Sequence, residues 1–218
     1  MAHKITALTP QKRNRQRVNV NLDGEFAFGL QRIVAAWLQV GQEISAEKIA
    51  QLQADDTLEV AYQKAIRLLS YRPRTEHEIR QNLSQHGYTE ESIDAVVYRL
   101  TKSGLVDDTR FAQSWIENRS AMRPRSQRAL AYELQRRGVD RQTIEQSLES
   151  IDEEALAYQA ALKKTDKFVN LDWNDFRQKL YRFLSQRGFN YEVISQVTAR
   201  LWAERLDGNL PTDGEEDT

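Results

Sequence analysis

Among the residue types of this chain, arginine has the spacing that suggests a binding function. One pair flanks a proline at 72–74, and a second pair flanks another at 123–125. The candidate contact residues are Arg72, Arg74, Arg119, Arg123, Arg125, Arg128, Arg136 and Arg137. A guanidinium presents a planar fork of N–H donors that matches a phosphate or a carboxylate. These arginines therefore predict contact with nucleic acid or with an acidic protein face. The alternative is a solvated surface with cations at helix ends.

Side chains for catalysis or metal binding are not gathered in any recognisable pattern. The three histidines, His3, His77 and His86, lack the paired ligands typical of a zinc site. No glycine-rich loop with a Walker lysine is present. The chain contains no cysteine, which excludes disulfides and thiol chemistry and fits a reducing cytoplasm. We therefore expect a cytoplasmic protein that is not an enzyme and needs no cofactor or metal.

The elements that must position the arginines follow a register that recurs three times. Apolar residues stand 8 and 4 residues before a glycine and 6, 10 and 13 residues after it. The three glycines are Gly87, Gly138 and Gly188, and Thr198 is the only residue that breaks the pattern. Tandem repeats of about 50 residues are typical of elongated proteins that bind other macromolecules on their exposed faces.

Each copy of the register predicts two helices joined by a tight corner. Apolar residues four positions apart mark one face of a helix, and glycine ends that helix because it accepts the left-handed conformation. Two residues later comes a good N-cap, which is Thr89, Asp140 or Asn190. A third helix precedes each corner, so the sequence predicts three helix-turn-helix-like repeats of three helices each.

The corners invite a DNA-reading interpretation, but the charge of their second helices argues against it. A recognition helix lies in a groove lined by phosphates. Here the second helices carry Glu90, Glu91 and Asp94 in one copy, and Glu145 and Glu149 in another. Phosphates would repel these carboxylates, so we do not expect the corners to read bases.

The N-terminal segment predicts a small β-sheet instead of helices. Val18 and Val20 alternate with asparagines, and Phe26 and Phe28 follow after Asp23-Gly24. A two-residue turn at Asp23-Gly24 would place the valines and phenylalanines on opposite faces, so a three-residue loop that pairs Val20 with Phe26 is preferred. Residues 5–8 are expected to add a strand, and residues 33–38 and 46–53 short helices.

The domain organisation expected from these patterns has five parts. They are the β-hairpin segment 1–54, the repeats 55–106, 107–150 and 151–206, and a disordered tail 207–218. The first part has seven basic and four acidic residues, whereas the tail has five acidic residues and no basic one. No run of apolar residues is long enough for a membrane helix. The expected fold is mainly α, an elongated array of repeats with a small N-terminal β element.

These motifs resemble the RecX family of regulatory proteins, which modulate the RecA recombinase. The most specific part of the likeness is Gly104-Leu105-Val106-Asp107-Asp108-Thr109-Arg110-Phe111-Ala112. The segments 69–75 and 136–139 and the hairpin segment 20–26 add to it, and the likeness covers roughly residues 15–205. The third repeat matches least well, and the acidic tail is not part of the family pattern.

The resemblance implies a function that the residues alone do not give. It implies a curved array of three three-helix modules that lies, as a monomer, in the groove of the RecA filament and contacts single-stranded DNA within it. Such a protein inhibits recombinase, ATPase and coprotease activities and so acts in DNA repair, homologous recombination and the SOS response. The alternative is a nonspecific nucleic-acid-binding protein that acts without RecA. A scaffold that binds only protein is a third interpretation.

Overall fold

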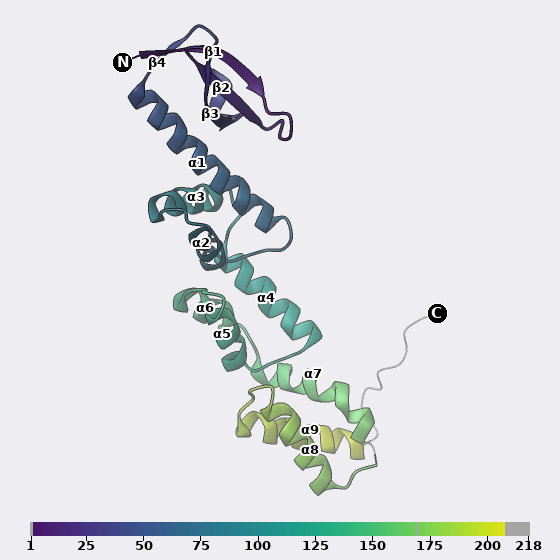
Figure 1. The fold of residues 1–218 in the computed structure, drawn as a ribbon. Coiled ribbons are helices and arrows are strands. Elements are labelled where there is room, and N and C mark those ends of the chain that lie inside the picture. The colour runs from purple at the N-terminus through teal and green to yellow at the C-terminus, as the bar shows by residue number, and fades with distance from the viewer. Residues whose placement is uncertain (1, 169, 208–218) are drawn as a thin grey trace. The chain divides into compact units, whose positions relative to one another are not determined.

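A computed structural model describes residues 2–168 and 170–207. These residues form nine α-helices, two short 3₁₀ helices and four β-strands (Figure 1). The chain divides into two compact units, Met1–Val106 and Asp107–Thr218. The prediction of a mainly α protein with three three-helix repeats and a small N-terminal sheet is confirmed. The expected acidic tail, apart from Asp207, lies outside the described residues.

The first unit begins with an antiparallel sheet in the strand order β3-β2-β1-β4. Its strands are β1 (Ala2–Pro10), β2 (Arg17–Leu22), β3 (Glu25–Gln31) and β4 (Glu43–Ser45), and the 3₁₀ helix η1 (Val34–Trp37) follows β3. Strand β1 extends the expected strand 5–8, and β4 was not expected. Val20, Phe28 and Leu30 on the sheet pack with Leu52 on the following helix. The sheet therefore buries one face against a helix, as a small sheet requires.

The predicted register of the β2–β3 hairpin is wrong. The turn is the two-residue Asp23-Gly24 type, because both residues have positive φ, 52° and 97°. The register shifts after Val20, which pairs with Phe28 instead of Phe26. This bulge leaves Ala27 unpaired and brings the valine and Phe28 onto one face. Phe26 is consequently 63% exposed.

A single helix, α1 (Ala46–Leu69), connects the sheet to the first repeat. The separate short helix expected at 46–53 is its first part, and the Ser45 hydroxyl caps it. Asp56 in this helix is buried and forms a 2.8 Å ion pair with Arg17 of β2. Helices α2 (Glu76–Gln85) and α3 (Glu90–Lys102) complete the repeat. Ala61 and Ala65 of α1 lie in its buried core, which also contains Leu83 and Leu100.

The second unit contains the other two repeats. Repeat two consists of α4 (Asp108–Met122), α5 (Gln127–Gln135) and α6 (Arg141–Leu148). Repeat three consists of α7 (Glu153–Thr165), α8 (Trp173–Ser185) and α9 (Tyr191–Leu206), with the short 3₁₀ helix η2 (Asp166–Phe168) after α7. Their apolar side chains form one continuous core. The two repeats are therefore one packed body.

All three predicted corners are confirmed. Gly87, Gly138 and Gly188 have φ values of 79°, 80° and 90°. In each corner the backbone N–H of the glycine and that of the following residue donate to carbonyls of the preceding helix. This is the hydrogen-bond pattern of a Schellman motif. The side chains of Thr89, Asp140 and Asn190 then accept the backbone N–H three residues ahead. The geometry of each corner follows from its own short sequence.

Candidate functional site

The two proline-flanking arginines of the first unit share one carboxylate. Arg72 forms a two-pronged bond with Glu78, at 2.9 Å and 3.0 Å. Arg74 lies 3.9 Å from the same carboxylate, and its Nε donates to the Leu68 carbonyl at 3.4 Å. Glu78 is the residue four positions after Arg74, on the first turn of α2. This pair of arginines therefore helps to fix the α1–α2 loop and retains limited excess charge.

Three of the other candidates gather around one side chain, Glu133 of α5. Its carboxylate accepts from Arg119 Nε at 2.8 Å and from Trp115 Nε1 at 2.9 Å. Arg125 Nη1 lies 3.0 Å from its other oxygen. The guanidinium of Arg137 stacks 3.9 Å from the centre of the Trp115 ring. One partly buried carboxylate and one indole thus hold three arginines from α4, from the α4–α5 loop and from the end of α5.

The remaining candidates are exposed. Arg123, Arg128 and Arg136 form no ion pair among the described residues. Arg123 is the C-cap of α4, and Arg128 is on the first turn of α5. Pro124 between them is buried, and so is Ser126, which caps α5 through the N–H of Ala129. Two free cations therefore flank a rigid loop in repeat two.

A further arginine at this loop, Arg187 of the α8–α9 corner, was not among the residues predicted from the sequence. Its Nη1 donates to the Pro124 carbonyl at 3.0 Å, and its own carbonyl accepts from the N–H of Ser126 at 3.1 Å. Partial burial, and then the positive charges of Arg125 and Arg123, lower the pKa of Arg187. The repeat register contained the signal, because Arg187 precedes Gly188 as Arg137 precedes Gly138.

The resulting feature is a basic junction, which we define as Arg123, Arg125, Arg128 and Arg187. Of its four guanidiniums, only Arg125 has a carboxylate partner among the described residues. Because the Arg187 guanidinium bonds to the carbonyl of Pro124, the residue between Arg123 and Arg125, like charges lie close together here. Such a concentration of arginine suits an anion, either a phosphate or a carboxylate of a partner protein.

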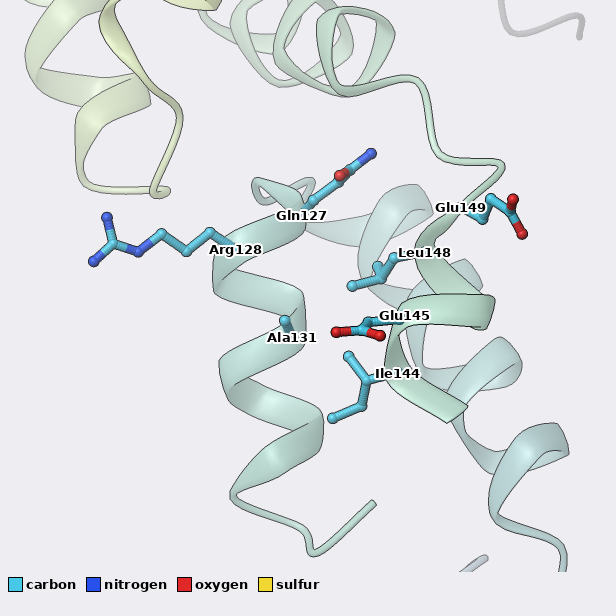
Figure 2. A pocket seen from close by; sticks show the side chains of 7 residues that line it. All are labelled: Gln127, Arg128, Ala131, Ile144, Glu145, Leu148 and Glu149. Carbon is cyan, nitrogen blue, oxygen red and sulfur yellow. The ribbon is translucent and has the colours of Figure 1, made fainter. Parts of the chain in front are cut away.

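An open groove lies beside the junction, between α5 and α6 (Figure 2). Its volume is about 340 Å³, and Ala131, Ile144 and Leu148 line it. Figure 2 shows the Arg128 side chain directed away from these apolar groups. Glu145 also lines the groove, with its side chain between those of Ile144 and Leu148 in Figure 2, and it pairs with Arg141 at 2.6 Å. The groove therefore offers apolar walls and no nucleophile–base pair.

The described residues contain neither a candidate metal site nor a membrane-spanning helix. No three histidine, aspartate or glutamate side chains are gathered as a metal site requires. None of the described helices has the length and apolarity of a membrane span. Two of the three histidines serve local structure, since His3 bonds Asp23 at 2.8 Å and His86 bonds the Asn82 carbonyl.

The fold and the basic junction define a class, a tandem three-helix-repeat protein with an arginine-rich face. Four family models match the chain. They are the RecX N-terminal domain over residues 3–45 and the first, second and third RecX three-helix domains over 61–100, 107–148 and 152–198. The chain belongs to the RecX family.

Relatives and solved structures agree with this assignment. A regulatory protein RecX of Clostridium beijerinckii is 31% identical over 211 residues, which cover 94% of this chain and 98% of the relative. One of Halalkalibacterium halodurans is 33% identical over 207 residues, covering 89% and 77%. A crystal structure of a regulatory protein RecX superposes with a TM-score of 0.73 at 26% identity, covering 90% and 99%. The RecX structure from Lactobacillus salivarius, at 20% identity and a TM-score of 0.62, shows the same fold over 68% of this chain.

Proposed function

We propose that this chain binds the RecA–single-stranded DNA filament and inhibits its recombinase, ATPase and coprotease activities. The single observation that carries the proposal is the basic junction in a chain of the RecX family. The filament is a polyanion because of its DNA, and an arginine-rich face suits such a partner. The protein acts as a monomer in the cytoplasm, without catalysis of its own.

The contact residues divide into two groups in this proposal. Arg123 and Arg128 are exposed and form no ion pair among the described residues, so they contact the partner directly. Arg119, Arg125 and Arg137 are engaged with Glu133 or Trp115 and present a fixed face. Arg136 extends that face at the α5–α6 corner. Arg72 and Arg74 contribute less, because Glu78 offsets their charge.

The test is ATP hydrolysis by RecA on single-stranded DNA, measured with increasing amounts of this protein. The wild-type chain should lower the rate, and Arg123→Glu/Arg128→Glu should require at least tenfold more protein for the same effect. The matched control is Arg110→Glu/Arg177→Glu, which reverses two exposed charges in the same unit and should behave as wild type. Unchanged hydrolysis with the wild-type chain would overturn the proposal.

Salt dependence separates the proposal from nonspecific nucleic-acid binding. A filament binder needs RecA, so its affinity for the filament should far exceed its affinity for free DNA. A protein that recognises only phosphates should bind both alike and should weaken steeply with salt in both cases. Equal affinity for the two at every salt concentration would favour the second candidate.

A further inference from the structure

In the sheet at the start of the first unit, an exposed basic cluster and the acidic β2–β3 turn lie at opposite ends. At one end the β1–β2 loop carries Lys12, Arg13 and Arg15, and Arg32 follows β3. At the other end the β2–β3 turn carries Asp23 and Glu25. Antiparallel pairing of β1 with β2 and of β2 with β3 places these two groups apart. The carboxylates of the acidic turn therefore do not neutralise the positive charges at the basic end.

The basic end is ordered by its own hydrogen bonds. In the loop, the N–H of Gln11 donates to the Arg17 carbonyl at 2.9 Å, and the N–H of Arg17 donates to the Asn14 carbonyl at 3.0 Å. The Asn14 side chain also accepts the N–H of Gln16. The N–H of Arg32 donates to the Gln16 carbonyl at 2.7 Å, which fixes Arg32 beside the loop. The four cations are thus held together by backbone geometry.

These cations have no carboxylate partner among the described residues. Lys12, Arg13, Arg15 and Arg32 are all exposed. The nearby Arg17 differs, because it turns inward to Asp56 at 2.8 Å and to the Gly29 carbonyl at 2.8 Å. The carboxylate of Asp56 is therefore paired with Arg17 and not with any of the four exposed cations. Four clustered positive charges repel one another, and an anionic ligand would remove that cost.

Two exposed apolar side chains, one of them aromatic, follow the last of these cations. Trp37, at the end of η1, is 88% exposed, and Ile33 is 61% exposed. Trp37 is five residues from Arg32, so their Cα atoms are at most about 17 Å apart. A flexible polynucleotide can contact both over a few nucleotides. Cations that follow a phosphate backbone, with an aromatic ring on which a base can stack, are the combination used for single strands.

We infer that Lys12, Arg13, Arg15, Arg32 and Trp37 form a binding site for single-stranded nucleic acid on the N-terminal sheet. The four cations contact successive phosphates, and the indole of Trp37 stacks on an unpaired base. Base identity is not read, because every base has a face for stacking. This site lies in a different unit from the basic junction, and it does not depend on the proposed action on RecA.

The test uses the full-length chain, a labelled oligothymidylate and no RecA. Binding is followed by fluorescence anisotropy over a range of salt concentrations. Arg13→Glu/Arg15→Glu should weaken binding at least tenfold and flatten the slope of log K against log salt by about 1.4, since each phosphate contact on a single strand contributes about 0.7. The matched control is Lys48→Glu/Arg67→Glu on α1, which makes the same change in charge and should retain wild-type affinity.

The aromatic contact is tested separately. Trp37→Ala should weaken binding roughly 5- to 150-fold, the range measured for loss of one stacked base. Trp37→Phe should retain most of the affinity but lose the tryptophan quenching that DNA causes. Phe26→Ala, an exposed aromatic at the acidic end of the same sheet, should change neither property.

Three outcomes would overturn the inference, and a fourth would overturn only the proposed function. Wild-type affinity in Arg13→Glu/Arg15→Glu would show that the loop contacts no DNA. Weakened filament binding with unchanged oligothymidylate binding would assign the loop to an acidic protein surface. Equal binding of a duplex, with no effect of Trp37→Ala, would show that only phosphates are recognised. A chain that binds oligothymidylate as described but leaves RecA unaffected would overturn only the proposed function.

Discussion

The backbone N–H of Ser126 donates to the carbonyl of Arg187 at 3.1 Å, and this bond joins repeat two to repeat three. Ser126 is the buried N-cap of α5, and Arg187 immediately precedes the corner glycine of repeat three. The Arg187 side chain returns to the same loop and donates to the Pro124 carbonyl at 3.0 Å. The loop that carries Arg123 and Arg125 is therefore held by the next repeat.

Gly188 should be harder to replace than Gly87, the corner glycine of repeat one. A Cβ at this position would lie 2.5 Å from Ser126 Oγ and 3.1 Å from Ala129 Cβ, whereas one at Gly87 would meet nothing within 4 Å. Both residues have positive φ, so alanine costs about 1–2 kcal/mol at either from backbone strain. Gly188→Ala should cost about 1–3 kcal/mol more than Gly87→Ala because of overpacking. Urea unfolding measures the difference, and equal losses would contradict this close packing.

Glu133→Gln should lower the stability of the protein without lowering its affinity for the filament. The amide can still accept from Trp115, but it loses the charge that pairs with Arg119 and Arg125. We expect a loss of about 1–2 kcal/mol in the free energy of unfolding, because these bonds are charge-assisted and partly buried. Filament affinity should not fall, since Arg125 is released. Glu149→Gln, at an exposed position, is the control, and a large drop in affinity for Glu133→Gln alone would assign Glu133 to the contact surface.

Thr198→Val should stabilise the protein. Thr198 is 1% exposed, and its hydroxyl has no hydrogen-bond partner among the described residues. A buried hydroxyl without a partner costs about 1–3 kcal/mol, so its removal should raise the free energy of unfolding by about 1–2 kcal/mol. The mirror variant is Val97→Thr, at the equivalent position of repeat one, and it should destabilise by a similar amount. A destabilised Thr198→Val variant would show that the hydroxyl is satisfied in solution.

The stability of the corner in repeat two should depend on pH through the carboxylate of Asp140. The Thr143 hydroxyl and then the Thr143 N–H, at 2.9 Å, donate to its carboxylate and lower its pKa below 3.8. Because the folded pKa is the lower one, this contribution to stability is present above about pH 3.8 and is lost as the pH falls through the folded pKa. The carboxyl chemical shift of Asp140, followed through an acid titration, measures it. In Asp140→Asn the amide still caps the helix, as Asn190 does in repeat three, and this pH dependence should disappear.

The sequence by itself determined the repeats. Each corner depends on interactions within about ten residues, such as the Schellman bonds at Gly138 and the cap at Asp140, and these act wherever the helices lie. The apolar register then identified buried positions such as Leu83 and Leu134, both 0% exposed. The positions of the eight candidate arginines at loops and helix ends followed from the sequence for the same reason, since such positions are local properties.

Only the tertiary structure decided which arginines are engaged and which strands pair in which register. Glu133 meets Arg119 across two helices, and Arg187 reaches Pro124 over 63 residues of sequence, so neither contact follows from a local pattern. The hairpin register was missed because the bulge after Val20 is selected by burial of Phe28 against α1, not by the turn residues. Side-chain partners and strand register are set by packing between distant segments, and that packing exists only in the folded chain.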